Sequence, residues 1–145
     1  MRSHNRFTAA AAGAVVALAL AAGCSSDDSS GENADACSSF ETHHNELVAL
    51  VDAGPGTAEE LETWTAAKNE AAAQLEGLPE AATDTVAESM STFVDGLPDE
   101  TLDLSETDSA SGQAFVANAN AVASACEADG SAISLTELPL VSFGS

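Results

Sequence analysis

Apolar residues recur at helical spacing in four separate stretches of the chain. The steps within each stretch are mostly three or four residues, so these side chains share one face of an α-helix while polar residues cover the other face. The four lines are Cys37, Phe40, His44, Leu47 and Val51; Leu61, Trp64, Ala67, Ala71, Leu75 and Leu78; Ala82, Val86, Met90, Phe93 and Leu97; and Phe115, Ala119, Val122 and Cys126. The pattern predicts four amphipathic helices.

Glycine and proline separate the first three helices, in the stretches DAGPG, EGLPE and DGLPD. We expect Gly77 and Gly96 to end helices in the left-handed conformation, and Pro79 and Pro98 to open the next segments. Four helices joined by mostly short turns predict an all-α fold, a small antiparallel four-helix bundle.

The C-terminal stretch SAISLTELPLVSFGS is too apolar for a disordered terminus. We expect an extended tail that lies back along a groove of the bundle. The alternative is an arm that pairs with a partner.

The N-terminus has the composition of an export signal. Arg2 and Arg6 are followed by an apolar run over residues 7–22, and no acidic residue precedes Cys24. A membrane-spanning helix needs about 20 apolar residues, so this shorter run predicts a signal peptide rather than a transmembrane anchor.

The run ends with Leu20, Ala21, Ala22, Gly23 and Cys24. This ending resembles the lipobox of bacterial lipoproteins in the style of high-GC Gram-positive bacteria, with Ala21 at the position where Leu is commonest. The resemblance implies cleavage before Cys24 and lipidation, such as by palmitate, of its sulfur. The alternative is an ordinary secretory signal that leaves Cys24 free.

The resulting organisation has three parts. Residues 1–23 form the signal peptide, residues 24–34 the lipidated cysteine with a flexible acidic tether, and residues 35–145 the helical domain. This organisation predicts attachment to the extracytoplasmic face of the cell membrane through the lipid on Cys24.

The chain has three cysteines. With Cys24 assigned to the lipid, Cys37 and Cys126 remain as a pair in an oxidising compartment, and we predict a disulfide between them. In an up-down-up-down bundle the start of the first helix and the end of the last lie at the same end, which suits this pairing.

The charge is strongly acidic, with 24 Asp and Glu against three Lys and Arg. Lys68 is the only base after the signal peptide, so nucleic-acid binding is excluded. The phosphate-binding patterns G-x-x-x-x-G-K-[ST] and G-x-G-x-x-G are absent, as is the nucleophile pattern G-x-S-x-G. We therefore predict no enzyme activity, no catalytic residue and no cofactor, and expect attraction to cations or a basic protein.

Two sites carry weak candidate chemistry. His43 and Glu46, three residues apart, are the one pair in ETHHNE with a spacing suited to a shared metal ion, whereas His44 is expected to be part-buried and hydrogen-bonded. Lys68 is expected to lay its stem over Trp64 with its ammonium in solvent. The acidic connection after residue 98 lacks the spacing of an EF-hand loop, so at most loose calcium binding is expected from its acids, Asp99, Glu100, Asp103, Glu106 and Asp108.

These observations predict a lipid-anchored, non-catalytic binding or structural protein. One alternative is a cation- or metal-binding lipoprotein that uses the acidic surface. Another is a carrier of a small apolar ligand in a cavity between the alanine-rich helices, which a well-formed apolar pocket near Trp64 would support.

Overall fold

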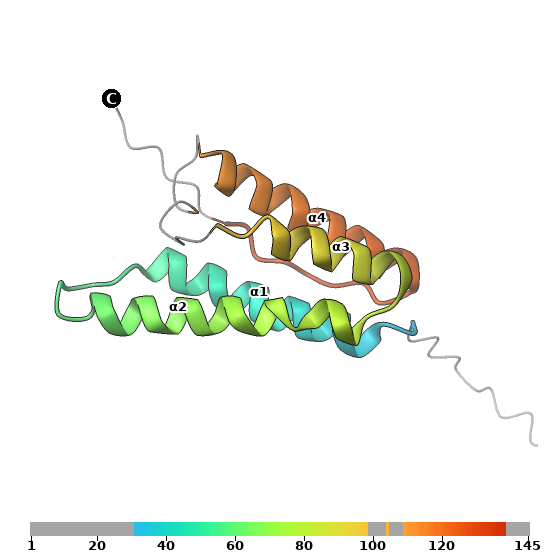
Figure 1. Ribbon diagram of the computed structural model, residues 1–145, viewed down its shortest axis with the longest axis horizontal. Coiled ribbons are helices and arrows are strands. Elements are labelled where there is room, and N and C mark those ends of the chain that lie inside the picture. Colours follow the sequence, from blue (N-terminus) through green and yellow to red (C-terminus); the bar gives the residue numbers. More distant parts are fainter. Residues whose placement is uncertain (1–30, 99–103, 105–108, 139–145) are drawn as a thin grey trace, which may run out of the picture.

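The computed structural model describes residues 31–98, 104 and 109–138 of the chain, and their regular elements are all helical (Figure 1). The elements in chain order are α1 (Ala34–Ala53), α2 (Leu61–Glu76), the short 3₁₀ helix η1 (Leu78–Ala81), α3 (Asp84–Asp95) and α4 (Ala110–Asp129). The predicted all-α class and the four predicted helices are confirmed. No helix in these ranges is both long and apolar enough to cross a membrane.

The helices form two antiparallel pairs that pack on one another. Helix α1 lies beside α2 and helix α3 lies beside α4, so successive helices run in opposite directions (Figure 1). The start of α1, η1, the start of α3 and the end of α4 meet at one end of the bundle. This is the up-down-up-down arrangement expected from the short turns.

The core consists of the predicted helical lines. Leu47, Leu75, Phe93 and Val122, one from each helix, are at most 1 % exposed. Helix α2 departs from its predicted line, because Leu61 is 45 % exposed while Lys68 is buried. The buried line of α2 is therefore Trp64, Lys68, Ala71 and Leu75.

The glycine predictions are wrong at two helix ends. Gly77 and Gly96 have φ values of −82° and −91°, which any residue adopts. After Gly77 the chain continues directly into η1 with Pro79 in its first turn, so no left-handed residue is required. Positive φ values at helix ends are found instead at Gly54 after α1, with φ of 63°, and at Gly130 after α4, with φ of 92°.

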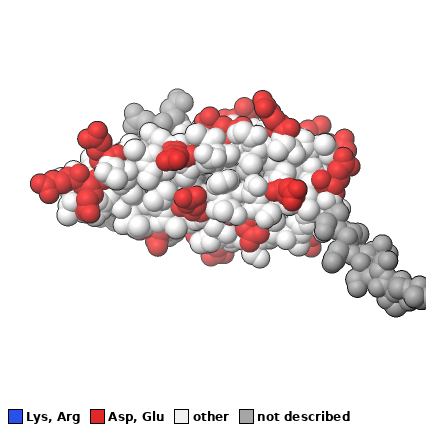
Figure 2. All heavy atoms as spheres, turned by 90° about the horizontal axis from the view of Figure 1, so that it is seen from below, with Lys and Arg blue, Asp and Glu red and all other residues white. Residues whose placement is uncertain are grey.

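Carboxylates cover the surface. Figure 2 shows acidic side chains scattered over one face, with no Lys or Arg visible on it. Within the described part of the chain no Asp or Glu is buried. Their charges therefore remain solvated, as the composition requires.

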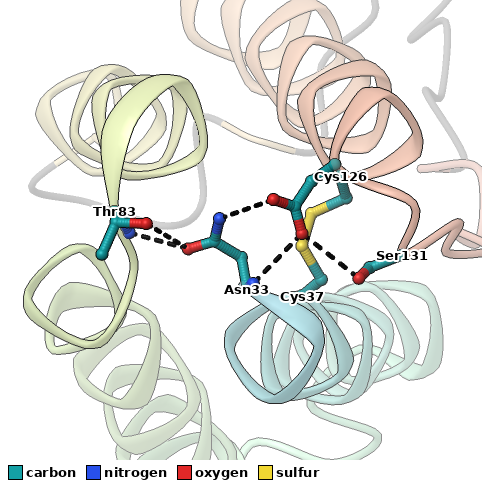
Figure 3. The surroundings of a disulfide bond; sticks show 6 residues. Asn33, Cys37, Thr83, Cys126 and Ser131 are labelled. Carbon is teal, nitrogen blue, oxygen red and sulfur yellow. Dashed lines mark hydrogen bonds between the residues drawn. A yellow bond between two sulfur atoms is a disulfide. The ribbon is translucent and has the colours of Figure 1, made fainter. Parts of the chain in front are cut away.

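The predicted disulfide is confirmed. Cys37 near the start of α1 and Cys126 near the end of α4 are bonded, with a Cα–Cα distance of 5.9 Å (Figure 3). Both residues are fully buried. The bond closes the bundle at the end where the two chain segments meet.

Asn33 joins three elements beside the disulfide (Figure 3). Its backbone N–H and Nδ2 donate to the two carboxylate oxygens of Asp129 at 3.1 and 3.0 Å. Its Oδ1 accepts from the Thr83 N–H at 2.7 Å. Since Asn33 is only 5 % exposed, these bonds link α1, α3 and α4 in a setting where an unpaired polar group is costly.

Residues 131–138 run from the end of α4 back along α1 and α4 (Figure 1). Leu138 is buried, and Ile133 and Leu135 pack against the core. The expected position of the tail in a groove of the bundle is thus confirmed for these residues, which we call the strap. The remaining apolar residues of the tail lie outside the described residues.

Candidate functional site

A buried histidine lies within a cluster of phenylalanines under the strap. The imidazole of His44 stacks on Phe115 with ring centroids 5.2 Å apart, and on Phe40 at 5.8 Å. Phe93 completes the cluster, with its ring 6.2 Å from that of His44. His44 is 2 % exposed, so the expectation of a hydrogen-bonded core histidine is confirmed, with deeper burial than expected.

Asn45 holds the strap against α1. Its Nδ2 donates to the Ser134 carbonyl at 3.0 Å, and its Oδ1 accepts from the Thr136 N–H at 2.7 Å. The side-chain amide thereby pairs with the extended strap much as a neighbouring strand would. These two backbone partners also fix which end of the amide carries the oxygen.

The orientation of Asn45 determines the tautomer of His44. The oxygen Oδ1 of Asn45 lies 3.2 Å from His44 Nδ1, and an amide oxygen only accepts. Nδ1 therefore carries the proton, and Nε2 of the neutral ring carries a lone pair. Burial lowers the pKa of His44 from its usual 6.5, an effect that its hydrogen bond to Asn45 only partly opposes, so the ring is neutral at neutral pH.

A cavity of about 220 Å³ opens beside His44 and beneath the strap. Phe115, Val116, Ala119, Leu135 and Leu138 supply apolar walls. The polar lining residues besides His44 are Asn120, Thr136 and Glu137, and all three are exposed. The cavity thus combines an apolar interior, one buried acceptor and a polar rim, an arrangement suited to holding a small molecule.

A larger hollow lies between α2 and the end of α3. Its volume is about 420 Å³, and its lining includes Asn69, Glu76 and Asp95. None of its lining residues is a buried polar or charged one. It therefore has the character of solvated surface, and the His44 cavity is the better candidate site.

The weak metal candidates lie close together without further ligands. His43 Nδ1 is 3.7 Å from a carboxylate oxygen of Glu46, and this Nδ1 has no hydrogen-bond partner among the described residues. In the same ranges no group of three or more His, Cys, Asp or Glu is arranged to hold a metal ion.

Lys68 is placed differently from the prediction. Its Nζ lies over the Trp64 ring at 3.8 Å from the centroid, so the expected contact with Trp64 is present. The residue is only 1 % exposed, however, and the expectation of an ammonium in solvent is wrong. The Trp64 Nε1 donates to the Leu50 carbonyl at 2.6 Å, which fixes the indole under the ammonium. Burial lowers the pKa of Lys68, and the contact is a cation–π interaction within the bundle.

Several predicted positions lie outside the described residues. They are Cys24 and the acids of the connection, Asp99, Glu100, Asp103, Glu106 and Asp108. The one described residue of the connection near them is Leu104, which is fully buried.

The pattern of the sequence did not point to Asn45 or Asn33. Each makes contacts with residues far along the chain, 89 and 96 positions away, which local periodicity does not reveal. Comparisons with protein-family models, with curated proteins and with solved structures each found no match.

Proposed function

We propose that the chain is a lipid-anchored, extracytoplasmic protein with a non-catalytic binding or structural role at the cell envelope. The observation that carries the proposal is the Cys37–Cys126 disulfide. A structural disulfide is typical of an oxidising compartment, and this one leaves Cys24 as the single remaining cysteine. Cys24 is also the residue that the lipobox resemblance assigns to the lipid.

The anchor limits the distance between the membrane and the disulfide end of the bundle. Gly31 contacts the end of α4, since a Cβ built on it would overlap the side chain and carbonyl of Asp129. Gly31 is seven positions after Cys24, and a fully extended chain over seven Cα-to-Cα steps reaches about 25 Å at most. The disulfide end of the bundle therefore stays within about 25 Å of the anchored cysteine.

Labelling with a palmitate analogue tests the anchor. In a bacterial host that processes lipoproteins, we expect the wild-type chain to take up the label and sediment with membranes, because acyl chains on Cys24 hold it there. The Cys24→Ala variant should lose both properties, and the matched variant Ser25→Ala should keep them. Label retained by Cys24→Ala would contradict the proposed anchor.

A second candidate function is a carrier of a small ligand. The observation that favours it is the His44 cavity, which lies under the strap and has no Trp64 among its described lining residues. The cavity is lined by side chains of α1, α4 and the strap, so it would remove part of the surface of an apolar molecule from water.

The cation-binding alternative rests on the acidic surface and the His43–Glu46 pair. Calorimetry with Ca²⁺ and Zn²⁺ distinguishes it from the other two. Saturable sub-micromolar binding that His43→Ala abolishes would support a metal site. Weak binding that salt screens would count against one.

A further inference from the structure

We propose that the His44 cavity binds a small neutral molecule of the phenol class, one aromatic ring whose hydroxyl donates to His44 Nε2. This inference rests on the carrier function proposed above and names its ligand class. Four properties of the cavity support it: the volume, the apolar walls, the acceptor nitrogen Nε2 of His44 and the charge of the lining.

The size of the cavity sets the size of the ligand. Its volume is about 220 Å³, and an apolar cavity of about 150 Å³ accommodates benzene. The site therefore has room for one ring with a small substituent. A long acyl chain or a fused multi-ring compound does not fit without movement of the strap.

The walls favour an aromatic ring. Phe115 lines the cavity and is itself held by stacking on His44 and by a contact with Phe93, whose ring centroid lies 5.1 Å away. A flat ligand can stack on or meet the edge of such a fixed ring. Leu135 and Leu138 of the strap supply the opposite apolar contact.

The buried acceptor determines the functional group. With Nδ1 donating to Asn45, Nε2 of His44 is a hydrogen-bond acceptor. Within the described ranges no hydrogen bond to Nε2 is found, although His44 is 2 % exposed and lines the cavity. A hydroxyl of a ligand in the cavity can donate to this ring nitrogen, which belongs to a side chain that lines the cavity.

The charge of the site selects a neutral ligand over an anion. Among the described residues the one acidic side chain that lines the cavity is Glu137, and the chain as a whole carries a formal net charge of −21. A carboxylate ligand would meet repulsion from Glu137 and would present no donor to Nε2. A phenol is neutral at pH 7, so Glu137 does not repel it, and its hydroxyl supplies a donor for Nε2.

Nuclear magnetic resonance titration of the oxidised soluble chain of residues 25–145, which leaves out the lipidated Cys24, tests the proposal, since this chain contains every described residue. The probes are 4-methylphenol, toluene and 4-methylbenzoate. We expect 4-methylphenol to shift the methyl signals of Val116, Leu135 and Leu138 and the ¹⁵Nε2 signal of His44. It should bind about five- to tenfold more tightly than toluene, the gain expected for one neutral hydrogen bond, and more tightly than 4-methylbenzoate.

Two variants test whether the preference for 4-methylphenol arises from the His44 cavity. His44→Phe keeps an aromatic ring in the stack but removes the acceptor, so 4-methylphenol should lose its advantage over toluene. Ala119→Leu fills the cavity and should weaken both probes, which keeps the test valid if His44→Phe fails to fold.

The outcomes distinguish failure of the assigned ligand class from failure of the carrier function. Equal binding of toluene and 4-methylphenol by the wild-type chain overturns the assigned ligand class and leaves the carrier function standing. No saturable binding of either probe overturns both.

Discussion

At the scale of single residues, two buried polar side chains determine how the bundle is held together. Asn33 links three helices at the disulfide end, and His44 lies in the aromatic cluster under the strap. Both side chains are buried, so their hydrogen bonds matter more than those of the many exposed carboxylates. Each leads to a prediction about stability.

The Asn33→Ala substitution should lower the free energy of unfolding by about 2 kcal/mol. It removes the acceptor of the Thr83 N–H and the Nδ2 donor to Asp129, two bonds of a side chain that is itself buried. Urea unfolding with the disulfide intact measures the loss. The control is Asn69→Ala on the exposed side of α2, which should change stability by no more than about 0.5 kcal/mol. Equal stability of the two variants would show that the Asn33 bonds contribute nothing.

Mild acid should destabilise the fold through His44. Burial lowers its folded-state pKa below the usual 6.5, so the unfolded chain takes up the proton first as pH falls. His44 leaves stability unchanged well above pH 6.5, and stability then decreases as pH falls from about 6.5 toward the folded-state pKa.

Urea unfolding between pH 7.5 and 5 measures this dependence. His44→Phe should remove most of the slope, whereas His43→Gln should retain it. Glu137, which lines the same cavity, is exposed, so we expect its attraction for a protonated His44 to be screened and the cost of burial to dominate. If His44→Phe keeps the wild-type change of unfolding free energy with pH, that change arises from groups other than His44.

At the scale of elements, the helices were predictable and several details of their ends and contacts were not. The four lines of apolar residues predicted α1 to α4 because a helix buries one face whatever its neighbours are. The conformations of Gly77 and Gly96 depend on where the chain goes next, and both proved right-handed.

Lys68 shows a second limit. Its sequence neighbours indicated the contact with Trp64, but its depth in the bundle is set by how α2 packs on α1. A charged residue at the edge of an apolar face is normally solvated, and here it is 1 % exposed. The sequence carries no local signal for that difference.

The strap depends on Asn45. Asn45→Ala removes the side-chain bonds to Ser134 and Thr136, so the strap should open more often while α1 to α4 stay folded. We expect amide exchange at Thr136 to accelerate about tenfold, as the loss of one to two hydrogen bonds implies.

Asn118→Ala is the matched control for the strap. It also removes a bond from a side-chain amide to a backbone carbonyl, that of Thr92, but it leaves the strap untouched. Exchange at Thr136 should stay at the wild-type rate in this variant. Unchanged exchange in Asn45→Ala as well would show that apolar contacts alone hold the strap.

At the scale of the whole molecule, the disulfide connects the fold with the proposed location. The pairing of Cys37 with Cys126 was predicted from the cysteine count and the bundle from the apolar lines, and the two predictions agree because the bundle topology brings these cysteines to one end. The His44 cavity was not predicted, since it forms between α1, α4 and the strap. A site built from such distant segments becomes visible only once the chain is folded.

Mass spectrometry of the protein isolated from membranes and digested without reduction tests both the proposed lipid on Cys24 and the disulfide between Cys37 and Cys126. We predict an N-terminal peptide that begins at Cys24 and carries the mass of a diacylglyceryl group, together with one peptide pair linked through Cys37 and Cys126. An N-terminal peptide that retains residues before Cys24, or an unmodified Cys24 thiol, would contradict the proposed lipid anchor.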